Sequence, residues 1–165
     1  MTSWKEKALE KVLYPSDLEG KVLALKARGL RIATLNGSFD LLHAGHLHII
    51  YEASKQADVL IVALNSDASI AAYKDKNRPI VCLQYRIEMM AALSFVDYVT
   101  WFDETDPCRI LQVIKPHMHI NGAEYGDNCV EAEVIKEGGG RLYLVDRIPS
   151  LSTTMIIHKI RDICD

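Results

Sequence analysis

Short apolar runs alternate with longer amphipathic stretches from about residue 30 to the end of the chain. The short runs are rich in Val, Ile, Leu and aromatic residues and end at Asn, Asp or Gly, which is typical of β-strands. The longer stretches place apolar residues at helical spacing. The pattern predicts strands at residues 31–36, 58–65, 98–102, 117–121 and 141–145, and helices at residues 45–56, 83–94, 107–114, 129–137 and about 152–163.

Alternating strands and helices predict a parallel sheet, because right-handed crossovers carry each helix across a face of the sheet. Residues 58–64 are almost continuously apolar, as a central strand buried on both faces requires. The predicted fold class is α/β: a Rossmann-like, doubly wound, parallel five-stranded sheet with helices on both faces. Three glycines at residues 138–140 follow a helix and precede a strand, so we interpret them as a helix stop and not as a phosphate loop.

The first 29 residues are expected to form an N-terminal helical extension, and residues 30–165 the core of a single domain. Helical patterns in the extension cover residues 4–13 and 16–28. Ser16, with Glu19 three residues later, fits a capping box and would begin the second of these helices.

Composition narrows the class of protein. A chain of 165 residues with 49% hydrophobic residues can close one sizeable core. The net charge of −3 gives no support to a nucleic-acid or membrane surface, and no apolar run approaches the length of a membrane span or a signal-peptide core. The four cysteines are widely spaced, which predicts reduced thiols and a cytoplasmic protein.

The strongest chemical signal is the run from Asn36 to His46, which follows the first predicted strand and opens the first crossover helix. In open α/β sheets, ligands bind beyond the carboxyl ends of the strands. His43 and His46 would share one side of the first helical turn, and Gly45 lets a ligand approach the backbone. Imidazole donors at a helix N-terminus favour phosphate and the charge of its transition state. No Cys, Asp or Glu nearby completes a zinc site, and His48 falls at a different helical angle, so it is interpreted as structural.

A second phosphate signal is the hydroxyl run Ser152-Thr153-Thr154 at the start of the last predicted helix. Hydroxyl donors combined with a helix N-terminus can cradle phosphate, or one of them can simply cap the helix. Lys74 and Lys76 lie in a polar loop after the second strand, where a surface role is the alternative.

The run from Asn36 to His46 resembles the His-x-Gly-His signature of the cytidylyltransferase-like nucleotidyltransferase superfamily. The stretches at residues 65–69, 77–80, 86–93, 102–104 and 152–157 are similar to one branch, the heptose 1-phosphate adenylyltransferases that make ADP-heptose for lipopolysaccharide. The resemblance runs in order over most of the chain, from about Lys21 to Arg161. It implies transfer of a nucleoside monophosphate to a phosphorylated small molecule, with pyrophosphate released.

The resemblance also implies roles for individual residues. For three of these residues a structural role is the alternative. Asp40 could instead brace its own loop, and Asn65 and Asp67 could instead cap the helix that follows them. The implied catalytic residues are His43, His46, Lys74 and Arg86; the nucleotide- or phosphate-binding residues are Gly37, Ser38, Phe39, Gly45, Asn121, Gly122, Ser152, Thr153 and Thr154; and the acceptor-binding residues are Asp40, Asn65, Asp67 and Arg78.

Asn121 departs from the branch, which commonly has a lysine in this position, and Ala123 stands where a glycine is usual. An amide can donate a hydrogen bond but carries no charge for an anionic ligand. Three readings therefore stay open: ATP with heptose 1-phosphate, CTP with glycerol 3-phosphate or another alcohol phosphate, and a nucleotide-binding protein with weakened catalysis. Mg²⁺ is expected to arrive with the ATP or CTP, held by phosphates and water and not by a protein cage. The resemblance also implies a homodimer, and the chain has no room for the sugar-kinase domain of the bifunctional members.

Overall fold

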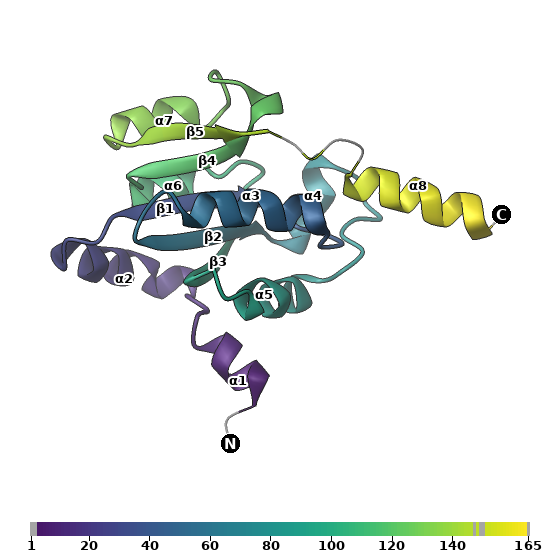
Figure 1. Ribbon diagram of the computed structural model, residues 1–165, viewed down its shortest axis with the longest axis horizontal. Coiled ribbons are helices and arrows are strands. Elements are labelled where there is room, and N and C mark those ends of the chain that lie inside the picture. Colours follow the sequence, from purple (N-terminus) through teal and green to yellow (C-terminus); the bar gives the residue numbers. More distant parts are fainter. Residues whose placement is uncertain (1–2, 147, 149–150, 165) are drawn as a thin grey trace.

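The computed structural model describes residues 3–146, 148 and 151–164 of the chain. Its five strands form one parallel sheet in the order β3-β2-β1-β4-β5 (Figure 1). The doubly wound α/β fold predicted from the alternating pattern is confirmed. The strands are β1 (Ile32–Gly37), β2 (Val59–Asn65), β3 (Tyr98–Phe102), β4 (Met118–Gly122) and β5 (Arg141–Val145).

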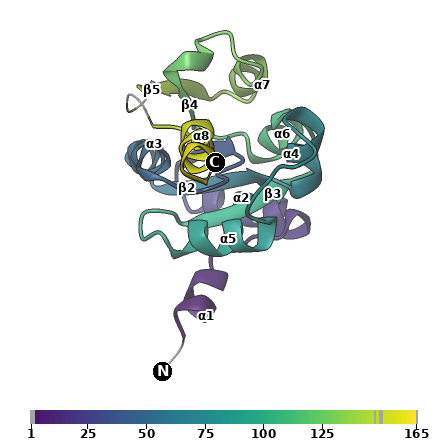
Figure 2. The same ribbon diagram turned by 90° about the vertical axis from the view of Figure 1, so that its right-hand side faces the viewer.

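Helices cover both faces of the sheet, as Figures 1 and 2 show. Apolar residues of α3 and α5 pack against one face, with α1 packed on α5, and those of α2, α6 and α7 pack against the other face. The helices are α1 (Trp4–Leu9), α2 (Pro15–Ala27), α3 (Ala44–Ser54), α4 (Asp67–Tyr73), α5 (Leu83–Ala92), α6 (Cys108–Ile114), the 3-10 helix η1 (Ala123–Tyr125), α7 (Ala132–Glu137) and α8 (Thr153–Cys164).

The core is built around β2, in which every residue is buried. Successive side chains of a strand point to opposite faces, so Leu60 and Val62 join one apolar cluster while Val59 and Ile61 join the other. Burying each such side chain stabilises the fold by roughly 1.5–3 kcal/mol. The continuous apolar run is therefore what holds the two helix layers to one sheet.

The N-terminal extension differs from its prediction in two respects. The first helix, predicted at residues 4–13, ends at Leu9, and Val12 forms an isolated β-bridge with Val99. Ser16 does not cap α2, because the helix already begins at Pro15 with Tyr14 as its N-cap. Proline suits the first helical position, where no backbone N–H is needed. A capping box occurs instead at α1, where Ser3 Oγ accepts from the Glu6 amide at 3.2 Å and the Glu6 carboxylate accepts from the Ser3 amide at 2.6 Å.

Two features of the C-terminal half bear on the site. Helix α7 begins at Ala132, later than predicted, because a turn closed by the bond from the Ala132 amide to the Cys129 carbonyl precedes it. The glycine run ends α7 as predicted, with Gly139 in the left-handed region at φ 79°. Helix α8 extends away from the sheet in Figure 1, and none of its residues is buried.

Candidate active site

A pocket of about 390 Å³ lies at the carboxyl ends of the strands. The chain leaves β1 toward β2 on one side and leaves β4 toward β5 on the other, so the neighbours β1 and β4 mark the point where the strand order reverses. Ligands of open α/β sheets bind in the crevice at this point. The residues selected from the sequence that line the pocket are Gly37, Ser38, Phe39, His43, Gly45, His46, Asn65, Lys74, Asn121, Gly122, Ser152, Thr153 and Thr154.

The two histidines are stacked at the start of α3. His43 is the N-cap, and its Nδ1 accepts from the His46 amide at 3.4 Å, which leaves the proton of a neutral His43 ring on Nε2. The His43 and His46 rings lie 3.7 Å apart at 20°, and the Phe39 ring meets His46 edge-on at 5.2 Å. A Cβ on Gly45 would come within 3.0 Å of the His43 ring, so a side chain there would displace that ring.

The turn that leads into the histidines is conformationally strained. Phe39 and Leu41 both have positive φ, at 46° and 53°, which is rare for residues other than glycine. Such strain costs about 1–3 kcal/mol per residue and persists only where surrounding contacts fix the backbone. Asp40, between the two, supplies such contacts, because its fully buried carboxylate accepts from Arg78 and from two backbone amides.

Lys74 brings a positive charge to the pocket from the end of α4. Its Nζ lies 2.8 Å from Ser38 Oγ, next to the strained turn. Burial, and then the charge of Arg78, lower the pKa of Lys74 from its ordinary value of 10.5. Burial also raises the pKa of the neighbouring Tyr73 hydroxyl, which lines the same pocket. Lys74 is exposed as a residue, but its ammonium group is partly desolvated where it meets Ser38, which strengthens its attraction for an anion.

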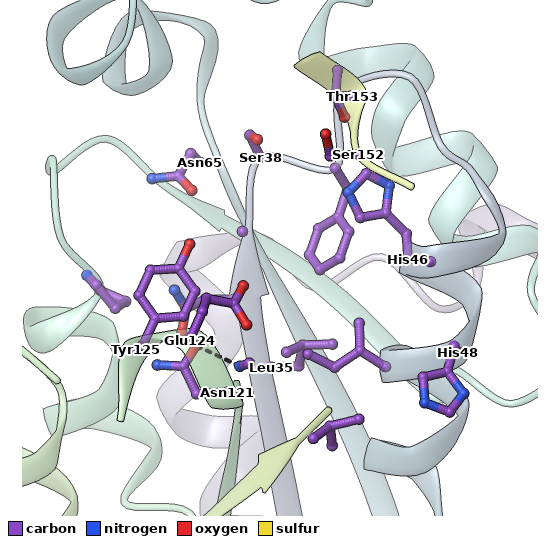
Figure 3. A pocket seen from close by; sticks show the side chains of 18 of the residues that line it. Leu35, Ser38, His46, His48, Asn65, Asn121, Glu124, Tyr125, Ser152 and Thr153 are labelled. Carbon is purple, nitrogen blue, oxygen red and sulfur yellow. Dashed lines mark hydrogen bonds between the residues drawn. The ribbon is translucent and has the colours of Figure 1, made fainter. Parts of the chain in front are cut away.

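The first turn of α8 forms another wall of the pocket (Figure 3). Ser152 Oγ accepts from the Met155 amide at 3.3 Å and thereby caps the helix. Thr153 Oγ1 donates to the Asp40 carbonyl at 2.8 Å, so this hydroxyl ties α8 to the strained turn. Among the three hydroxyl residues, Thr154 has no side-chain bond of this kind among those described.

Four residues expected in the site do not line the pocket: Arg86, Asp40, Asp67 and Arg78. Arg86 is only 1% exposed, and its Nη1 donates to the carbonyls of Ser38 at 2.7 Å and Asn65 at 2.8 Å. Its Nη2 pairs with Asp67 at 2.6 Å. The guanidinium therefore ties the ends of β1 and β2 together. Asp40 takes up the bracing role that was its alternative.

The pocket also contains residues that sequence reasoning missed. His48 lines it although it lies at a different angle on α3 from His46, because the cavity continues along the helix past Leu35 and Ile49. Glu124 of η1 folds back over Gly122, where a Cβ would clash with its carboxylate. Figure 3 shows Asn121, Glu124 and Tyr125 across the pocket from His46. In the sequence, the presence of Asn121 where the heptose branch commonly has a lysine pointed to this wall of the pocket. Nothing in the hydrophobic pattern or the motifs indicated that His48 lines the pocket.

Comparison with known proteins agrees with this geometry. The family model described as cytidylyltransferase-like matches residues 34–159. The chain therefore belongs to the cytidylyltransferase-like family and is a nucleotidyltransferase.

Among individual relatives, the bifunctional protein HldE of Geobacter metallireducens is 42% identical over 144 residues, and that of Hahella chejuensis is 39% identical over 137 residues. These matches cover 87% and 82% of the chain but 29% of each relative, so the chain spans about three-tenths of their length.

Solved structures give the same result for the fold. A lipopolysaccharide core biosynthesis protein from Thermoplasma volcanium superimposes with a TM-score of 0.58 at 28% identity, over 73% of this chain and 98% of that one. A pantoate-beta-alanine ligase from Francisella tularensis superimposes with a TM-score of 0.61 at 18% identity, over 93% of this chain and 78% of that one, which supports the fold alone.

None of the described helices is both long and apolar enough to cross a bilayer. Within residues 3–146, 148 and 151–164, no group of three or more His, Cys, Asp or Glu side chains is arranged to hold a metal ion. The four cysteines, all in this part of the chain, are free thiols.

Proposed function

We propose that this protein transfers AMP from ATP to a sugar 1-phosphate, with heptose 1-phosphate as the acceptor, giving ADP-heptose and pyrophosphate. One observation carries the proposal: the stacked His43 and His46, Lys74 and the first turn of α8 converge on one pocket at the switch point of the sheet. This arrangement supplies nitrogen donors, one positive charge and a helix N-terminus to a polyphosphate.

The proposed reaction needs no protein nucleophile. An oxygen of the acceptor phosphate attacks the α-phosphorus of ATP, the bond from that phosphorus to the bridging oxygen breaks, and pyrophosphate leaves with the electron pair. The attacking phosphate is already ionised near neutral pH, so catalysis comes from positioning and charge neutralisation. His43 and His46 would donate to the oxygens of the transferred phosphate, and Lys74 would balance the charge that builds on them.

Mg²⁺ would accompany the ATP. The pocket lining contains imidazole and ammonium nitrogens and the carboxylates of Asp106, Glu124, Glu131 and Asp146, but no three His, Cys, Asp or Glu side chains of the described residues are grouped to hold a metal ion. The ion would therefore be held by phosphates and water, where it neutralises the triphosphate and orients the leaving pyrophosphate. Gly37, Gly45 and Gly122 line the pocket, and the space that a side chain would need at each is taken by Phe39, His43 and Glu124 respectively.

The acceptor is proposed from the relatives and from the sequence stretches shared with the heptose branch. HldE proteins match most of this chain, and a lipopolysaccharide core biosynthesis protein shares its fold at 28% identity. Asn65, at the end of β2, remains the proposed acceptor contact that lines the pocket. Asp40, Asp67 and Arg78 would act on the acceptor only through the loops that they hold.

The test is pyrophosphate release by the purified protein with Mg²⁺, either ATP or CTP, and a panel of sugar 1-phosphates and alcohol phosphates. We expect release with ATP and heptose 1-phosphate. Turnover with CTP alone would replace the donor and acceptor while keeping the chemistry, and silence with every pair would leave a nucleotide-binding protein.

His46→Ala is the variant that checks the assignment of the chemistry. Loss of one donor to the transition state is expected to lower kcat by about 10²–10³-fold while ATP still binds. Leu47→Ala is the matched control, because Leu47 is exposed on the same helix and does not line the pocket. Equal activity of the two variants would remove His46 from the mechanism.

A homodimer is the proposed assembly. Helix α8 exposes Met155, Ile160 and Ile163 at 50%, 53% and 70%, which is apolar area that a second copy can cover. Light scattering of the protein is expected to give twice the chain mass, and Ile160→Asp with Ile163→Asp to give the mass of one chain. A single-chain mass for the unaltered protein at assay concentration would contradict the proposal.

A further inference from the structure

Asp40 is buried beneath the site without lining it. Its side chain is 0% exposed. Oδ2 accepts from Arg78 Nε at 2.8 Å, from Arg78 Nη2 at 2.6 Å and from the Ile80 amide at 2.9 Å, while Oδ1 accepts from the Val81 amide at 2.9 Å. Burial alone would raise the pKa of this carboxyl, but the two amide donors and Arg78 outweigh it and lower the pKa. The group is an ionised carboxylate with both oxygens committed to one loop.

The loop that Asp40 holds carries Lys74. Residues 74–81 connect α4 to the segment before α5, and residues 74–77 are exposed. The far end of the loop is anchored by Asp40 and by Arg86 Nε, which donates to the Val81 carbonyl at 2.9 Å. The near end of the loop is the C-cap of α4, where Lys74 Nζ lies 2.8 Å from Ser38 Oγ in the turn that Asp40 braces.

The backbone of Asp40 holds a second segment. The Asp40 carbonyl accepts a hydrogen bond from Oγ1 of Thr153, and Thr153 is the first residue of α8. This bond matters because no residue of α8 is buried, so little packing fixes the position of the helix. One residue thus joins the turn before the histidines, the lysine loop and the hydroxyl turn of α8, and each of these three segments lines the pocket.

We propose that Asp40 is a positioning residue that sets the places of Lys74 and of the first turn of α8 relative to His43 and His46. Its effect on turnover rests on the proposed nucleotidyl transfer, whereas its effect on the loop does not. A misplacement of about 1 Å at a phosphoryl-transfer site lowers the rate by about 10²-fold, so correct spacing of these groups is itself a catalytic requirement.

The test compares Asp40→Asn, Lys74→Ala and the double variant in full-length protein. Asparagine keeps the shape but loses the charge and one acceptor oxygen. We expect kcat to fall about 10²-fold in Asp40→Asn and the two substitutions to be non-additive, because Asp40 acts largely through Lys74. Asp17→Asn, an exposed carboxylate on α2 away from the pocket lining, is the control and should match the unaltered protein.

A second readout follows the loop without any turnover. Trypsin should cut after Lys74 or Lys76 at least tenfold faster in Asp40→Asn than in the unaltered protein, and Asp17→Asn should show no change. Arg78→Gln removes the guanidinium but leaves the Ile80 and Val81 amides bonded to Asp40, so cleavage should also become faster in this variant, but to a smaller extent. This variant replaces Asp40→Asn in the test if Asp40→Asn does not fold.

The outcomes separate this inference from the proposed function. Additive losses with unchanged cleavage of the loop would overturn the positioning role even if adenylyl transfer is found. If no donor and acceptor pair turns over, the proposed function fails, and faster cleavage in Asp40→Asn would still support the positioning role. Unchanged cleavage in both Asp40→Asn and Arg78→Gln would reject it.

Discussion

Among the side chains that line the pocket, Lys74 has a charge that depends on its surroundings. Burial and the charge of Arg78 lower its pKa, so the ammonium group is lost at lower pH than in an ordinary lysine. The positive charge is present below the lowered pKa and disappears as pH rises through it. An arginine keeps its charge throughout this range.

The pH dependence of kcat/KM should reveal this. We expect an alkaline fall in the unaltered protein below pH 10.5, and a displacement of that fall to higher pH in Lys74→Arg, whatever the absolute rate of the variant. Identical alkaline limbs in the two proteins would assign the fall to another group.

His48 allows a test of how far the ligand extends along α3. It lines the pocket beside the apolar side chains of Leu35 and Ile49, a setting that suits a flat heterocycle better than a phosphate. His48→Ala is expected to raise KM for the nucleotide about 2–10-fold with kcat nearly unchanged, the size of a lost ring contact. A fall in kcat with unchanged KM would instead move His48 into the chemical step.

The start of α8 lines the pocket and is also bonded to the strained turn. Thr153 was selected from the sequence for phosphate binding, and its hydroxyl is engaged with the Asp40 carbonyl. Thr153→Val, which keeps the shape but removes the donor, is expected to lower kcat/KM roughly tenfold, the effect of about one hydrogen bond. Thr153→Ser retains the donor and should stay within about twofold. Equal losses in both variants would point to the methyl group and not to the bond.

The helices and strands could be predicted from the sequence more reliably than the contacts that their side chains make. The apolar run of β2 and the glycines after α7 fix those elements locally, so the sequence alone located them. The placing of Arg86 could not be read in the same way, because its partners Ser38 and Asn65 lie 48 and 21 residues away in the chain. From the sequence alone, an arginine at a helix start could bind either a phosphate or backbone carbonyls. Only the folded sheet brings the Ser38 and Asn65 carbonyls close enough together to bind this guanidinium.

The molecule as a whole contains a neutral histidine in its core, on β4. His119 is fully buried, its Nδ1 lies 2.8 Å from Thr34 Oγ1, and burial lowers its pKa to about 4. In the unfolded chain the pKa is near 6.5, so the unfolded state binds more protons between pH 4 and 6.5. Stability from this residue is complete above pH 6.5 and is lost as pH falls, by about 3 kcal/mol at pH 4.

Urea unfolding at pH 7.5 and pH 4.5 measures this contribution. His119→Gln should be less stable at pH 7.5 but lose less free energy of unfolding on acidification than the unaltered protein does. His158→Gln, at an exposed position on α8, is the control and should keep the full acid sensitivity. Equal acid losses in all three proteins would exclude His119 as the source.

Helix α8 is both a wall of the pocket and an element without a buried residue. A lone helix of this length is marginally stable in water, so part of the order in its outer turns depends on what holds its first turn. Ligand affinity and helix order are then linked in both directions. Amide hydrogen exchange along α8 should slow as nucleotide saturates the site, and any substitution or contact that firms its outer turns should tighten nucleotide binding from a distance.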